Sequence, residues 1–96
     1  MVLSEKNFLV AAVCDGFGEK GSFFSINLAD NLSNIFHEKR QEIFDLEKTT
    51  SVIIDAIIAT FDSLKRQVFD TYAGTTLVLT VVFPDGNFFA FSLGDS

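Results

Sequence analysis

The chain has 96 residues, enough for one small domain, and 48% of them are hydrophobic, including 12 phenylalanines. The formal net charge of -6 disfavours a nucleic-acid partner or an anionic membrane surface, because a negative protein surface repels phosphate groups. The single cysteine excludes an internal disulfide and points to a reducing compartment.

The N-terminal segment, residues 1–6, lacks the basic region and the long apolar stretch of a secretory signal. Elsewhere no apolar run approaches the roughly 20 residues of a membrane helix. We therefore expect a cytoplasmic or otherwise intracellular protein with no membrane partner.

The first predicted element is a buried strand at residues 8–14, which are apolar throughout. The carboxylate of Asp15 is expected at the rim of the sheet, where charge can meet solvent or a cation. Asp15-Gly16 and Gly94-Asp95 each end an apolar, strand-like run, which suggests a shared acidic pocket for a hard divalent metal. The alternative interpretation is that these residues only end strands as turn formers.

An amphipathic helix is predicted after a glycine-rich turn at residues 15–21. Ser22 can cap this helix, which runs to about Arg40. Apolar side chains at helical spacing predict one buried face, made of Phe24, Leu28, Leu32, Ile35 and Phe36. His37 falls in the last turn, where positive charge suits the exposed carbonyls, so we interpret it as a helix-end residue rather than a ligand.

A second amphipathic helix is predicted from about Ser51 to Asp70, with Thr49, Thr50 or Ser51 as its cap. Its expected apolar stripe consists of Ile54, Ile57, Ile58, Phe61, Leu64 and Val68. Because neither helix is apolar all round, both are expected to lie on a surface with one face inward.

A β-hairpin is predicted at the end of the chain. Residues 75–83 and 88–93 flank the sequence Pro-Asp-Gly-Asn at 84–87, which is typical of a turn. The first arm is apolar on both faces, so both faces must be covered. The helices can cover one of them. The other requires either the rest of a larger layered domain or self-association of the chain.

Two other motifs in the sequence have a possible functional interpretation. Residues 16–21 match G-x-G-x-x-G after a strand, which leaves a nucleotide-binding βαβ unit as a lesser alternative, although Asp15 would place negative charge near the pyrophosphate. Cys14 is expected to be a small core residue, because Lys20 stands where a cysteine-dependent phosphate loop needs Arg. We also expect the neighbouring Asp15 to raise the thiol pKa, which opposes nucleophile formation.

Three short motifs follow one another along the chain: Asp15-Gly16-Phe17-Gly18, Gly74-Thr75-Thr76 and Gly94-Asp95-Ser96. Their order resembles the N-terminal half of the metal-dependent, type-2C (PPM-type) protein serine/threonine phosphatases. In that family a strand ends in D-G-H-G-G, two antiparallel helices follow, S-G-[ST]-T/A starts the next strand, and a later strand ends in G-D-S-R. The resemblance covers nearly all of residues 1–96.

The resemblance implies an α+β fold that is part of a four-layer α-β-β-α sandwich, with antiparallel sheets between helix pairs. This chain would supply one strand, two helices and a β-hairpin, without the first strands and the C-terminal half of the domain. It also implies that Asp15 bridges two Mg²⁺ or Mn²⁺ ions, that the carbonyl of Gly16 binds one of them, and that Asp95 lies near the same cluster. A metal-activated water would hydrolyse phosphoserine or phosphothreonine in a phosphoprotein substrate.

The chain also departs from the family pattern. Phe17 replaces the histidine, and Glu19 and Lys20 interrupt the second glycine position. One or two carboxylates cannot hold two cations that each want about six oxygens, so we assign no catalytic residue and expect the chain alone to be inactive. A non-catalytic, phosphatase-like interaction or regulatory module remains the main alternative.

Overall fold

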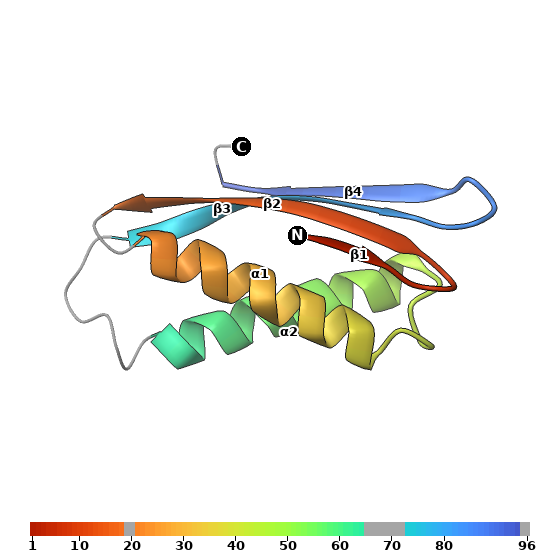
Figure 1. Cartoon of the computed structure of the whole chain (residues 1–96), viewed down its shortest axis with the longest axis horizontal. Coiled ribbons are helices and arrows are strands. Elements are labelled where there is room, and N and C mark those ends of the chain that lie inside the picture. The colour runs from red at the N-terminus through yellow and green to blue at the C-terminus, as the bar shows by residue number, and fades with distance from the viewer. Residues whose placement is uncertain (19–20, 65–72, 95–96) are drawn as a thin grey trace.

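A four-stranded antiparallel sheet with two helices on one of its faces makes up the described part of the chain (Figure 1). The structure, a computed structural model, describes residues 1–18, 21–64 and 73–94. The elements along the chain are β1 (Val2–Ser4), β2 (Leu9–Gly18), α1 (Gly21–Glu38), α2 (Leu46–Leu64), β3 (Ala73–Val82) and β4 (Phe88–Leu93). The predicted α+β class is confirmed, and the described residues form one sheet layer and one helix layer.

The strands are ordered β1-β2-β3-β4, and every neighbouring pair is antiparallel. β2 and β3 pair over ten residues each, from Leu9 opposite Val82 to Gly18 opposite Ala73. A βαβ unit needs a second strand that returns parallel to the first, whereas β3, the strand after the helices, is antiparallel to β2. The lesser alternative, a nucleotide-binding βαβ unit, is therefore wrong in its topology.

The core lies between the sheet and the helices. Alternate residues of β2 and β3 are buried on this side, namely Val10, Ala12, Leu77, Leu79 and Val81. The predicted inner face of α1 is confirmed by side chains that are buried or, for Ile35, partly buried: Phe24, Leu28, Leu32, Ile35 and Phe36. The Phe8 and Phe36 rings lie 5.8 Å apart at a tilted angle, so aromatic packing fills the core near the end of α1.

The predicted cap of the second helix is wrong, and its predicted stripe is wrong at Ile54, Ile58 and Phe61. α2 begins at Leu46 because Asp45 caps it, its carboxylate accepting a hydrogen bond of 2.8 Å from the backbone N–H of Lys48. The buried face consists of Thr49, Val52, Ile53, Ala56 and Thr60. Of the predicted stripe, Ile57 is partly buried, while Ile54, Ile58 and Phe61 are exposed. The side chain of Leu64, Val68 and the expected end at Asp70 lie outside the described residues.

The choice of this face has a physical reason. α2 is apolar on two sides, so sequence periodicity alone does not select between them. The side with the smaller residues meets α1, where Asn31 Nδ2 donates a hydrogen bond of 2.9 Å to Thr60 Oγ1. Thr60 Oγ1 in turn donates to the carbonyl of Ala56 at 2.8 Å, so its buried hydroxyl is fully satisfied.

Three boundaries near the N-terminus also differ from expectation. The sequence did not suggest β1, which pairs with β2 and is held by reciprocal backbone hydrogen bonds between Met1 and Ala12. The predicted turn at 15–21 is wrong for residues 15–18, which continue β2 because they pair with residues 73–76 of β3. α1 begins at Gly21, so Ser22 lies inside the helix rather than at its cap.

Neither α1 nor α2 has the combination of length and apolar composition that a bilayer-spanning helix requires.

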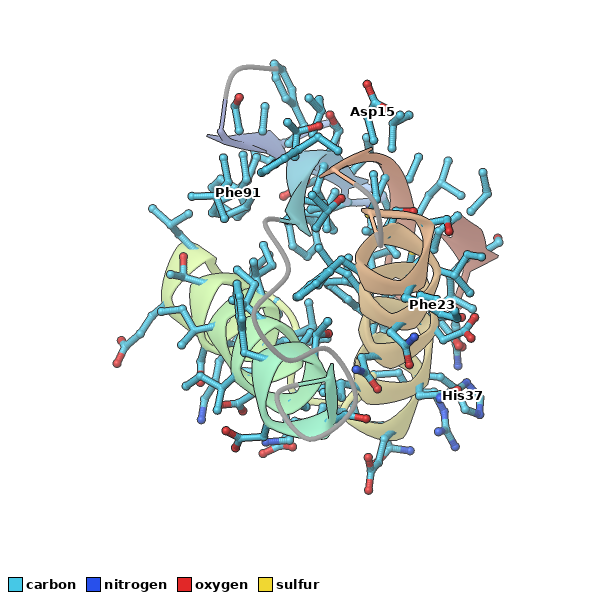
Figure 2. All side chains as sticks on the ribbon, turned by 90° about the vertical axis from the view of Figure 1, so that its left-hand side faces the viewer. Asp15, Phe23, His37 and Phe91 are labelled. Atoms are coloured by element: carbon cyan, nitrogen blue, oxygen red, sulfur yellow. The ribbon has the colours of Figure 1, made fainter. Side chains whose placement is uncertain are left out.

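The second face of the sheet is uncovered by the described residues, as predicted from the strands that are apolar on both sides. Figure 2 shows this face on the opposite side of the sheet from the two helices. We call it the bare face. Strand alternation and register assign to it Val2, Ser4, Leu9, Ala11, Val13, Asp15, Phe17, Gly74, Thr76, Val78, Thr80, Val82, Phe88, Ala90 and Ser92.

Candidate functional site

Asp15 lies on the bare face, near the C-terminal end of β2. It is exposed and alternates with Cys14 and Gly16, which face the helices. Figure 2 shows its carboxylate directed away from the helix layer that carries Phe23 and His37. Because β2 continues to Gly18, Asp15 is not the last residue of the strand, which corrects that prediction. Its side chain is nevertheless open to solvent or to a cation.

Gly16 is required by the close approach of α1 to β2. A Cβ at Gly16 would collide with the carbonyl group of Gly21, the first residue of α1, and a Cβ at Gly21 would lie 2.7 Å from the carbonyl carbon of Gly16. Gly18 has a φ of +84°, a conformation that glycine adopts without steric cost. The glycines of the G-x-G-x-x-G pattern thus have packing and backbone roles that involve no nucleotide.

The ends of β2 and β4 meet at the same end of the sheet. Both strands are antiparallel to β3, which lies between them. Thr76 of β3 is opposite Asp15 on one side, and on the other side a Cβ at Gly94 would lie 3.1 Å from its Cγ2 atom. Two strand spacings separate β2 from β4, which is about 10 Å. Asp95 itself lies outside the described residues, so its distance from Asp15 stays a prediction.

Thr76 is the residue of this region that sequence reasoning did not single out. Its Oγ1 donates a long hydrogen bond of 3.4 Å to the backbone carbonyl of Asp15, which links the two strands beside the carboxylate. Thr76 belongs to the small-residue motif at 74–76, so the sequence did mark the segment. Only the strand register places it between the two aspartate-containing motifs.

The described residues contain no group of three or more His, Cys, Asp or Glu side chains that could hold a metal ion. The carboxylate of Asp15 is a suitable hard oxygen ligand for Mg²⁺ or Mn²⁺. Such ions take about six ligands, so a metal held here needs oxygens from other parts of the protein or from water.

Cys14 and His37 have structural environments. Burial raises the pKa of the Cys14 thiol, and the N-terminal ammonium opposes this by a smaller effect, so the thiol is neutral rather than nucleophilic at neutral pH. The expected cause, the charge of Asp15, is wrong, because the two side chains lie on opposite faces of β2. His37 is in the last turn of α1, as predicted, and its Nδ1 lies 2.6 Å from Glu5 Oε1.

Comparisons of the whole chain with protein families, with curated proteins and with solved structures find no match. The assignment of the site therefore depends on its residues and their geometry.

Proposed function

We propose that this chain is part of a metal-dependent protein serine/threonine phosphatase that hydrolyses phosphoserine and phosphothreonine in its full-length form. The observation that carries the proposal is the common end of β2 and β4. The register sets Asp15 and Gly94 on either side of Thr76, so motifs that are far apart in the sequence reach one end of one sheet. A shared metal site requires such convergence. The alternative, in which these residues only end strands as turn formers, does not require it.

The direction of Asp15 also supports the proposal. In a four-layer sandwich the second sheet packs on the face that the helices leave open, and Asp15 lies on that face. A carboxylate there would lie between the two sheets, at the end of the sandwich, where it can hold cations and remain accessible to substrate. Asp15, the carbonyl of Gly16 and Asp95 would contribute oxygens, and the remaining ligands would come from the other sheet.

In this chemistry, the role of the chain would be to hold the metal ions and fix their position. When bound, two divalent ions would activate a water molecule and offset charge on the phosphoryl group. Asp15 would fix the position of these ions. Gly16 allows the close packing of α1 on β2 that holds this part of the strand in place. Among the described residues, Asp15 is the carboxylate at this end of the sheet, and one carboxylate cannot hold two cations. The chain alone should therefore not hydrolyse a phosphopeptide.

A non-catalytic, phosphatase-like interaction or regulatory module is the second candidate, and Phe17 favours it. The ring of Phe17 covers Gly74 across the strand pair, since a Cβ at Gly74 would lie 2.6 Å from the Cζ atom of Phe17. An aromatic ring that shields a strand glycine stabilises the sheet, whereas the family histidine at this position is polar. A chain that keeps the fold and has lost the chemistry would show this kind of exchange.

The test is Mn²⁺ binding, followed by the electron paramagnetic resonance signal of the free ion. We expect the 96-residue chain to bind Mn²⁺ weakly, with a Kd on the order of 1 mM, and Asp15→Asn to weaken binding about tenfold. Asp30→Asn is the matched control, because it removes the same charge from an exposed position on α1. Equal binding by the two variants would show that the ion only responds to net charge and would contradict the proposed site. Phosphopeptide hydrolysis by a form extended with its flanking sequence then separates the enzyme from the inactive module.

A further inference from the structure

The bare face is a continuous apolar surface of unusual size for a chain this small. Its large side chains include Val13 and Phe88, which are 69% and 65% exposed. Across four strands about 4.8 Å apart and seven residues of strand length, it covers roughly 450 Å². Monomers seldom expose contiguous apolar patches of more than a few hundred Å², and larger ones usually mark an interface. Among the described residues of this face, Asp15 is the only charged one, and it lies at one end.

The relief of the bare face is organised in rows that cross the strands. A low row of small side chains, Ala11, Thr80 and Ala90, crosses β2, β3 and β4, and Val2 of β1 stands at its end. On one side of it, Leu9, Val82 and Phe88 form a raised row that ends at the small Ser4 of β1. On the other side, Val13 and Val78 form a second raised row that ends at Ser92. Neighbouring rows are two residues apart along the strands, or about 6.7 Å.

We propose that two copies of this chain associate through their bare faces, sheet against sheet. A two-fold rotation that reverses the strand direction places a raised row of each copy in the low row of the other, so the surface is complementary to itself. Packed sheets lie about 10 Å apart, which side chains interlocked in this way would fill. The helices then lie outside, and the pair has the layer order α-β-β-α. This inference does not rest on the proposed function, because it requires neither a metal nor a substrate. The second copy would occupy the face that the second sheet covers in the proposed complete domain, so the pairing concerns the 96-residue chain without that sheet.

The area suits a reversible dimer. Two bare faces would bury roughly 900 Å² in total, which exceeds most crystal-packing contacts and falls in the range of weak, transient interfaces. We therefore expect a Kd on the order of 10 µM. Each copy carries a net charge of -6, so the two copies repel each other, and added salt should strengthen the association by screening this charge.

The experiment is sedimentation equilibrium of the 96-residue chain from about 1 to 500 µM, in buffer of physiological ionic strength. The mass should rise with concentration from 10.6 kDa toward twice that value and no further. Val13→Lys should weaken the association about tenfold or more, because the ammonium would be buried between the sheets. Ser92→Lys adds a charge to the same row without removing an apolar side chain. It replaces Val13→Lys as the test variant if circular dichroism shows that Val13→Lys does not fold.

Ile58→Lys is the control, since Ile58 is a similarly exposed apolar residue on α2, in the other layer, and its replacement should leave the mass unchanged. A chain that stays at 10.6 kDa at the highest concentration overturns the proposal. So does an association that Ile58→Lys weakens as much as Val13→Lys. Association that neither bare-face variant affects, or that grows beyond a dimer, would instead indicate edge-to-edge pairing of strands and would also overturn it.

Discussion

At the scale of single residues, the glycines around Asp15 have separate physical roles that a motif does not distinguish. Gly16 and Gly21 are in backbone contact, which lets α1 start directly against β2. Gly86, in the hairpin turn, has open space around it and a φ of +91°, so it is needed for its backbone conformation alone. Steric contact and backbone conformation should therefore be separable by the same substitution at two positions.

We predict that Gly16→Ala lowers the free energy of unfolding by about 2–3 kcal/mol, because β2 and α1 must move apart to admit the methyl group. Gly86→Ala should lower the free energy of unfolding by only about 1 kcal/mol, because the alanine adopts a positive φ but meets no neighbouring atoms. Urea titrations followed by circular dichroism measure both values. Equal costs would mean that the contact between Gly16 and Gly21 does not constrain the chain.

At the scale of elements, α2 shows how a helix start is selected by one side chain. Asp45 accepts the hydrogen bond from the Lys48 N–H, and its own backbone carbonyl accepts a hydrogen bond of 2.7 Å from Thr49 Oγ1. Thr49, expected to be a cap, is instead buried one turn inside the helix. Aspartate and threonine are both common caps, so composition does not decide between them.

We predict that Asp45→Ala destabilises the protein by about 1 kcal/mol, because the N–H of Lys48 loses its partner. Asp45→Asn should retain most of the stability, since the amide oxygen can accept the same hydrogen bond. Thermal unfolding of the two variants, compared with the unchanged chain, measures the difference. If Asp45→Asn and Asp45→Ala lower the stability by the same amount, the side chain of residue 45 is not the cap.

At the scale of the whole molecule, the protein has one core and a second apolar surface. The sheet is buried by the helices on one side, while the bare face is open on the other. Phenylalanines occur in both environments: Phe36 is fully buried in the core, whereas Phe88 is 65% exposed at the end of the bare face. The two residues should therefore affect different properties of the molecule.

We predict that Phe36→Ala costs about 3–5 kcal/mol of unfolding free energy, which is a large part of the stability of a small domain. Phe88→Ala should change the stability of the dilute chain by no more than about 0.5 kcal/mol. Denaturant unfolding at low chain concentration, below the range in which copies associate, provides the comparison. A large cost for Phe88→Ala in dilute solution would show that the bare face is already covered within one chain.

Much of the fold was predictable from local sequence. The helical spacing of apolar residues defined the inner face of α1, and the Pro-Asp-Gly-Asn turn defined the hairpin between β3 and β4. The apolar character of both faces of β3 also predicted the bare face. For the candidate site, the sequence drew attention to Asp15 and Gly16, but not to the continuation of β2 beyond them.

The remaining features depend on contacts between residues that are far apart along the chain. The buried side of α2 is the side that packs against α1, where Asn31 donates a hydrogen bond to Thr60. β1 forms because β2 offers an edge, and its three residues carry too short a pattern to be recognised alone.

Local sequence was therefore enough to predict two helices, the hairpin and the need for a cover on a second apolar face, because periodicity and turn chemistry act over a few neighbouring residues. Two features instead depend on pairing between distant segments: the strand register that sets Thr76 between Asp15 and Gly94, and the face from which the Asp15 carboxylate projects. Register is fixed by pairing across the sheet, and a shift of one residue would turn every side chain of β2 to the opposite face.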